Sequence, residues 1–253
     1  MNIPTKRILN VTIRSLAIVI LPIAIMAMLK SSSEPVIFFL KDTVVENSLK
    51  QWETGNSIIF NISIGYIVSF LFWVMNVALP GSRKRKLLKN NLKKQYKYFK
   101  HDVIRILMNA YETYRRDYDD SLQIYFDKPE LVDKLCHHEE FKRFFSADGN
   151  KNWYAVLNGL QYEKSHLSDL YIEFGILADD ISYVLNNVNI DDDEVVSFFK
   201  NFSSHTYRLK NASVYSDDQA KYLGNFLWEI LAQWSFIHGH RKKDQIFEMI
   251  NQI

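Results

Sequence analysis

One uncharged stretch of 22 residues restricts the fold of this chain more than any other sequence feature. Residues Ile58–Leu79 read IIFNISIGYIVSFLFWVMNVAL, and Pro80-Gly81 follows them. A helix rises about 1.5 Å per residue, so a run of this length can cross roughly 30 Å of hydrocarbon. We therefore predict a transmembrane helix at about residues 58–79 that ends at Pro80-Gly81.

A second apolar run lies nearer the start of the chain. Residues 11–29 (VTIRSLAIVILPIAIMAML) contain one charge, Arg14, close enough to one end to reach the lipid headgroups. We predict a first transmembrane helix here, kinked at Pro22, which lacks a backbone N–H. A cleaved signal peptide is the alternative, but the apolar core is long and no small-residue cleavage site follows it.

Basic residues are distributed unevenly around these two runs. Arg83, Lys84, Arg85 and Lys86 directly follow the second run, whereas residues 30–57 carry three Lys against four acids. Positive residues are retained on the cytoplasmic side, so we predict that both termini are cytoplasmic and that the basic cluster contacts anionic headgroups. The alternative for the basic cluster is contact with nucleic acid.

Residues 35–52 are predicted to form an amphipathic segment on the outer face.

Small and polar residues recur within the second run. Asn61, Gly65, Ser69 and Asn76 are three or four residues apart, with Phe72 between the last two, and therefore share one helix face. Small residues allow close helix approach in a membrane, and Asn seeks hydrogen bonds across the contact. We call these four residues the polar stripe and predict that it mediates helix association. Three roles for the stripe remain open, namely packing on the first helix, self-association between copies, and lining a polar path through the bilayer.

The rest of the chain is predicted to be a helical domain. The whole chain has only 8 Gly and 5 Pro, which leaves little turn chemistry for hairpins. We predict an all-α fold with a membrane domain at residues 1–82 and a cytoplasmic helical bundle at residues 83–253. The expected domain helices are 87–118, 129–135, 139–145, 162–187, one that starts at a cap on Asp191, 217–237 and 244–250. Ser216 is expected to cap the helix at 217–237, and residues 146–150 are expected to form a turn.

The charge balance and the lone cysteine exclude several classes of function. Residues 1–94 carry 13 Lys or Arg against four Asp or Glu, and residues 95–253 carry 18 against 25. A net negative domain does not present a broad nucleic-acid surface, although a local basic patch is still allowed. Cys136 alone cannot form an intramolecular disulfide or a cysteine-rich zinc site, and we expect it to be a buried small hydrophobe.

No residue pattern predicts an enzyme. The candidate groups are His137-His138-Glu139-Glu140, His238-Gly239-His240, the acidic run at 191–194 and Asp179-Asp180. Neighbouring residues on a helix point about 100° apart and share a metal ion poorly, and an acidic run is favourable at a helix start without any metal. Phosphate-binding, dinucleotide and hydrolase motifs are missing from the sequence. We predict no catalytic residues, no metal, no cofactor and no small-molecule substrate.

The architecture resembles a known class of proteins. Two spans, a polycationic stop and a helical domain without an enzyme motif are similar to the two-transmembrane effectors of bacterial anti-phage systems, among them those encoded beside retron reverse transcriptases. The segment NISIGYIVSFLFWVMNVALPGSRKRK looks most like the second span of such effectors.

The resemblance implies a mechanism and a set of partners. The protein would sit in the bacterial inner membrane, held inactive by a cytoplasmic partner such as a reverse transcriptase with its RNA–DNA product. Once released, it would perturb the membrane, alone or as a homo-oligomer, and stop growth. The alternative is a membrane-tethered adaptor whose helical domain recruits a cytoplasmic protein.

Overall fold

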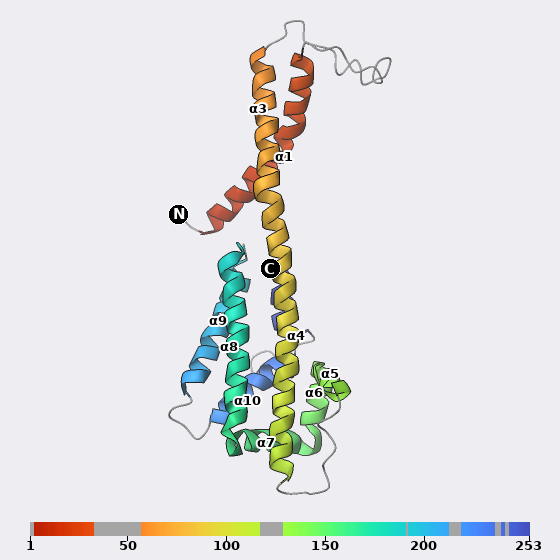
Figure 1. Ribbon diagram of the computed structural model, residues 1–253, viewed down its shortest axis with the longest axis vertical. Helices are drawn as coiled ribbons and strands as arrows, with labels where there is room; N and C mark the ends of the chain where they lie inside the picture. Colours follow the sequence, from red (N-terminus) through yellow and green to blue (C-terminus); the bar gives the residue numbers. More distant parts are fainter. Residues whose placement is uncertain are drawn as a thin grey trace. The chain divides into compact units, whose positions relative to one another are not determined.

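The computed structural model describes residues 3–32, 57–116, 129–190, 192–212, 219–235, 239–240 and 243–253 (Figure 1). Helices form the regular structure of these residues, apart from the antiparallel strands β1 (Trp234–Ser235) and β2 (Gly239–His240), in which Trp234 pairs with His240. The all-α prediction is thus confirmed for this part of the chain. Two compact units result, Met1–Lys84 and Arg85–Ile253, with a boundary close to the one expected after residue 82.

The first unit is built from apolar helices. Helix α1 (Ile3–Ser31) packs side by side with α3 (Ser57–Trp73), which continues into the π-helix η2 (Val74–Ala78). One helix of the described residues, beginning at Ser57, is long and apolar enough to cross a membrane, and Ser15–Ser31 forms a shorter apolar helix. Residues 35–52, predicted as an external amphipathic segment, lie outside the described residues.

The predicted helix end at Pro80-Gly81 is wrong, because α4 (Leu79–Arg116) contains both residues. Proline lacks an N–H, and its ring collides with the carbonyl four residues back, here that of Asn76. The wider turn of η2 lies immediately before Pro80, and its Leu79 N–H donates to the Val74 carbonyl, five residues back. A π turn displaces the backbone enough for the helix to continue past the proline.

The described residues of the second unit form most of α4 and seven further helices. These are α5 (Pro129–Leu135), α6 (His138–Phe145), α7 (Ala147–Tyr162), α8 (Lys164–Asn187), α9 (Asp193–Ala212), α10 (Gln219–Leu231) and α11 (Gln245–Gln252). Helices α8 and α9 lie side by side, and α10 contacts α6, α7 and α9 (Figure 1).

The core of this unit follows the helical periodicity of the sequence. The residues predicted for the apolar face of α8 are all buried, namely Leu167, Leu170, Phe174, Leu177, Ile181 and Val184. On α4, Leu88, Leu92, Phe99, Val103, Leu107 and Ala110 are buried, and Ile106 and Tyr114 pack against the same core at partial exposure. Burial of these stripes provides the main driving force for folding of the domain.

Several local predictions need correction. The expected turn at 146–150 is instead the start of α7, although Gly149 and Asn150 have the positive φ values of 70° and 66° that turn residues tolerate. Helix α9 is capped by Asp192, whose Oδ1 accepts from the Glu194 N–H at 3.0 Å, and Asp191 lies outside the described residues. The predicted cap at Ser216 also lies outside the described residues. Helix α10 ends at Leu231, six residues before the predicted end at 237.

One carboxylate, that of Asp244, joins the start of the last helix to α4. Asp244 caps α11 by accepting from the Phe247 N–H at 3.1 Å. The same side chain accepts from the Tyr96 hydroxyl at 2.9 Å and pairs with Lys100 at 3.2 Å. Burial, then the nearby Asp244 charge, raises the pKa of Tyr96 well above its ordinary value of 10.0, so the phenol stays a hydrogen-bond donor.

Gly159 lies where α7 closely approaches α4. A Cβ at Gly159 of α7 would lie 1.9 Å from the Ala110 carbonyl oxygen of α4, which is backbone and cannot rotate away. We expect Gly159→Ala to lower the free energy of unfolding by about 3 kcal/mol, because α4 and α7 must separate. Chemical denaturation of the full chain in neutral detergent, followed by tryptophan fluorescence, measures this change.

Gly175 provides the matched control. It lies inside α8, and a Cβ there would have nothing within 4 Å. Gly175→Ala should raise stability by about 0.5–1 kcal/mol, because alanine restricts the unfolded chain and favours a helix. Equal effects of the two substitutions would contradict the close contact at Gly159.

Candidate functional site

The contact between α1 and α3 uses small residues on both helices. Ser63 of α3 and Ala24 of α1 are buried, with 5% and 7% of their surfaces exposed. The Tyr66 hydroxyl donates to the Ala17 carbonyl at 2.7 Å, which joins α3 to α1 in the same contact. Ala24 and the Ala17 carbonyl of the first helix therefore lie toward α3.

The polar stripe lies on the other side of α3. Asn61, Gly65, Ser69 and Asn76 are all exposed, and a Cβ at Gly65 would have nothing within 4 Å. Residues 61 and 65 are each two positions from Ser63, which places them about 200° around the helix from the α1 contact. The interpretation that the stripe packs on the chain's own first helix is therefore wrong, whereas self-association remains a prediction.

Asn76 has an additional role within its own helix. Its side-chain amide donates to the Phe72 carbonyl at 2.9 Å. This bond lies in the turn that widens into η2 before Pro80, where the regular α-helical bonding pattern changes. Asn76 thus supports the proline-containing turn, and Asn61 and Ser69 are left as the stripe residues best placed to contact another helix.

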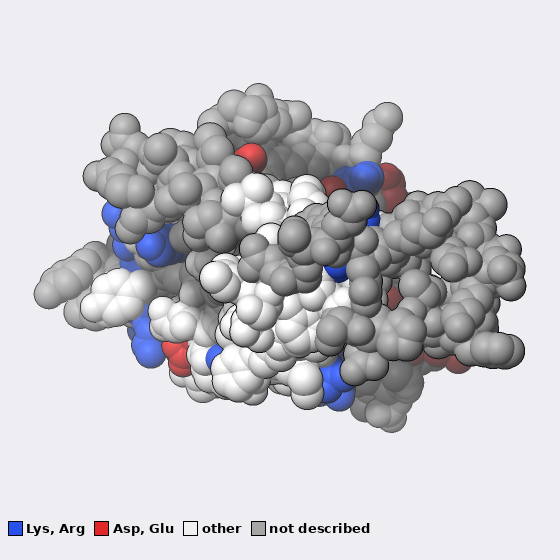
Figure 2. All heavy atoms as spheres, turned by 90° about the horizontal axis from the view of Figure 1, so that it is seen from above, with Lys and Arg blue, Asp and Glu red and all other residues white. Residues whose placement is uncertain are grey.

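The remaining surface of α3 is apolar. Ile62, Phe72 and Met75 are 66–68% exposed. Uncharged side chains make up much of the described surface that is seen from above (Figure 2). A polar stripe on such a helix is a local exception, because groups that need hydrogen bonds are costly in hydrocarbon.

The basic cluster at residues 83–86 is divided by the structure. Arg83, Lys84 and Lys86 are exposed, and headgroup contact stays a prediction for these three. Arg85 instead donates to the Ile253 carbonyl at the end of α11, and Lys89 donates to the Asn251 carbonyl. Burial, then the neighbouring Lys93 and Arg85 charges, lowers the pKa of Lys89. Cations are favourable at these carbonyls because a helix carries partial negative charge at its C-terminus.

The groups weighed for catalysis or metal binding are not brought together in the described part of the chain. Among the described residues, no three His, Cys, Asp or Glu side chains are placed to hold a metal ion. The nearest partner of His138 is the adjacent Glu139, at 3.4 Å. Asp179 is exposed on α8, and burial together with the Asp179 charge raises the pKa of Asp180. His238 and Asp191 lie outside the described residues.

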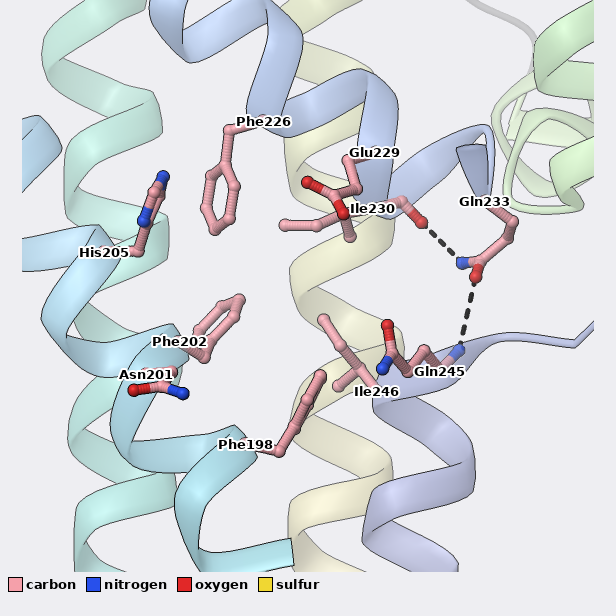
Figure 3. A pocket seen from close by; sticks show the side chains of 10 residues that line it. All are labelled: Phe198, Asn201, Phe202, His205, Phe226, Glu229, Ile230, Gln233, Gln245 and Ile246. Carbon is pink, nitrogen blue, oxygen red and sulfur yellow. Dashed lines mark hydrogen bonds between the residues drawn. The ribbon is translucent and has the colours of Figure 1, made fainter. Parts of the chain in front are cut away.

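A pocket that the sequence did not predict opens between α9, α10 and α11. Its volume is about 220 Å³, and Phe198, Phe202 and Phe226 form its aromatic part (Figure 3). The His205 ring lies 4.9 Å from the Phe226 ring, between centroids. Glu229 and Asn201 add a carboxylate and an amide to the lining. The volume is enough for one side chain of a partner, to which the phenylalanine rings offer apolar contacts and Asn201 and Glu229 offer polar ones.

Gln233 holds one wall of this pocket in place. It follows the end of α10 with a positive φ of 53° and is buried. Its amide nitrogen donates to the Ile230 carbonyl, and its amide oxygen accepts from the Gln245 N–H at 3.2 Å (Figure 3). One buried side chain therefore links the end of α10 to the start of α11.

Comparison of the chain with known protein families, with curated proteins and with solved structures finds no match.

Replacing Gln233 should loosen the pocket wall. Gln233→Ala keeps an L-residue at the positive φ, so backbone strain is unchanged, but two buried groups lose their partners. We expect the free energy of unfolding to fall by about 2–3 kcal/mol, measured by denaturation of the full chain in detergent. Gln252→Ala, at an exposed position of α11, is the control and should change stability by less than about 0.5 kcal/mol. Similar losses in both variants would contradict the role given to Gln233.

Proposed function

We propose that this chain is a membrane-anchored effector that associates through α3 and perturbs the bacterial inner membrane when a cytoplasmic partner releases or activates it. The observation that carries the proposal is the polar stripe, which is exposed on the side of α3 opposite α1. An adaptor that used its spans only as an anchor would have no need of such a face.

Exposure of the apolar residues supports insertion in a membrane. Only 6% of the most apolar 18-residue window of the long helix is buried, whereas the core helix of a water-soluble protein would be mostly covered. On this proposal α3 and η2 form one span, and α1 forms the second by adding residues 11–14 to the apolar helix Ser15–Ser31. Arg83, Lys84 and Lys86 then place both termini in the cytoplasm.

The stripe supports association between copies. An Asn side chain facing lipid lacks hydrogen-bond partners, and a bond across a helix contact contributes about 0.6–2 kcal/mol in membranes. A second copy presents the same stripe and can pair through it symmetrically. Several copies would bring Asn61 and Ser69 together within the bilayer, and a water-accessible defect there would dissipate the membrane potential.

The partner follows from the architectural resemblance. A reverse transcriptase with its RNA–DNA product is the proposed cytoplasmic restraint, and the helical domain would be the part that contacts it. The net negative charge of residues 95–253 favours a contact made through the protein component over one made through nucleic acid.

Disulfide formation between copies tests the association. With Cys136→Ala as background, we expect Ser69→Cys to crosslink two chains when membranes are oxidised, because the stripes face each other. Ser63→Cys is the matched control, since Ser63 is buried against α1 and should not crosslink. Dimers are read on non-reducing gels. The proposed association would be excluded if Ser69→Cys gave no dimer, or if both variants gave equal amounts of dimer.

Induced expression tests the membrane step. We expect the native chain to depolarise bacteria and admit propidium, and a variant with Asn61, Gly65, Ser69 and Asn76 changed to Leu to do so about tenfold less, as losing roughly 1.4 kcal/mol of association would predict. Ile58→Leu, Ile62→Leu and Val68→Leu together form the control, because these exposed residues are already apolar. Undiminished toxicity of the stripe variant would exclude the proposed mechanism.

The second candidate is a membrane-tethered adaptor, and the aromatic pocket between α9, α10 and α11 favours it. A partner's apolar side chain inserted beside Glu229 would dock the domain on a cytoplasmic protein. Replacement of both spans by an unrelated pair separates the two candidates. Activity retained after the exchange indicates the adaptor, and activity lost indicates the effector.

A further inference from the structure

A second hollow of the helical domain has a different chemistry from the aromatic pocket. It lies between α4, the end of α5 and α11, and its volume is about 550 Å³. Lys93, Lys97 and Lys100 of α4 line it, and Asp133 is the one carboxylate in the lining. Residues four and three positions apart share one helix face, so the three ammonium groups converge on the same space.

The positive charge of this hollow is only partly balanced. Lys100 pairs with Asp244 at 3.2 Å, and Lys93 lies over the Phe247 ring at 5.4 Å from its centroid. Lys97 is exposed, and among the described residues no carboxylate lies within 4 Å of Lys93 or Lys97. Two lysines therefore remain available to an anion.

The rest of the lining consists of Tyr96, Cys136, His137 and Phe247. Phe247 presents a half-exposed ring, and Tyr96 is buried with its hydroxyl bound to Asp244. Cys136 is partly exposed in the hollow, where burial raises its pKa although Lys100 lowers it, so the thiol is a neutral contact surface. A ligand here meets the lysine ammonium groups together with the Phe247 ring, the Cys136 thiol and the His137 ring.

We propose that this hollow binds a small phosphorylated molecule, with its phosphate between Lys93 and Lys97 and its apolar or planar part against Phe247 and Cys136. Lysine is a common phosphate ligand, and the volume lies within the range of small-molecule sites. The walls come from three helices, so the site is concave and suits a compact ligand. The phosphate can come from a nucleotide or from a glycerophospholipid headgroup, which share this chemistry.

Thermal unfolding of the full chain in neutral detergent tests the site. The probes are AMP and ATP, glycerol phosphate and short-chain phosphatidylglycerol, and adenosine without phosphate. We expect a nucleotide or a lipid probe to raise the unfolding midpoint by about 3 °C or more near saturation, and adenosine to have no effect. A nucleotide shift identifies the first source, and a shift with glycerol phosphate or the lipid identifies the second.

Lys97→Ala is the diagnostic variant, because Lys97 is exposed and its removal leaves the fold intact. It should weaken binding of the active probe about tenfold or more, as expected for one charge-assisted contact. Lys94→Ala is the control, since Lys94 lies over Tyr98 outside the hollow. The proposal is overturned if no phosphorylated probe shifts the midpoint, or if both variants weaken binding equally. These outcomes are independent of toxicity and of stripe crosslinking.

Discussion

The apolar surface of α3 is the constraint on which the rest of the first unit depends. Ile62 and Phe72 of α3 and Met75 of η2 are two-thirds exposed, and among the described residues α1 packs against one side of α3, so much apolar surface stays uncovered. A hydrocarbon environment removes this conflict but imposes another, because every polar group must then find a partner within the protein. The Tyr66 hydroxyl, bound to the Ala17 carbonyl, and the Asn76 amide, bound to the Phe72 carbonyl, meet that demand inside the chain.

Helical periodicity predicted the core well, and single boundary residues poorly. The α8 stripe from Leu167 to Val184 was predictable because burial repeats every three or four residues and each position contributes to the same signal. Pro80 predicts a helix end because proline removes one backbone hydrogen bond. The π turn that lets the helix continue past Pro80 has no sequence signature. The α9 cap was misplaced by one residue because consecutive aspartates offer the same capping oxygen.

The candidate sites show the same division. Spacing predicts that the residues of the polar stripe share one helix face, but it does not predict what packs against that face. Both sides of α3 offer small residues, Ser63 on one side and Gly65 and Ser69 on the other. Packing against α1 selected Ser63 and left the stripe exposed. Neither pocket could be predicted, since each joins residues far apart in the chain: Phe198 with Ile246, and Lys93 with Asp133 and Phe247.

The charge of the helical domain argues for a small ligand in the lysine hollow. Residues 85–253 carry 25 acids against 23 Lys or Arg, so the domain as a whole has no positive field that would attract a polyanion. Charges more than about 10 Å away are largely screened at ordinary salt, so a ligand with one or a few charges is affected mainly by the groups close to it. Inside the hollow, Lys93 and Lys97 act at short range, which favours a compact phosphate ester over a nucleic-acid backbone that needs Lys or Arg along its whole length.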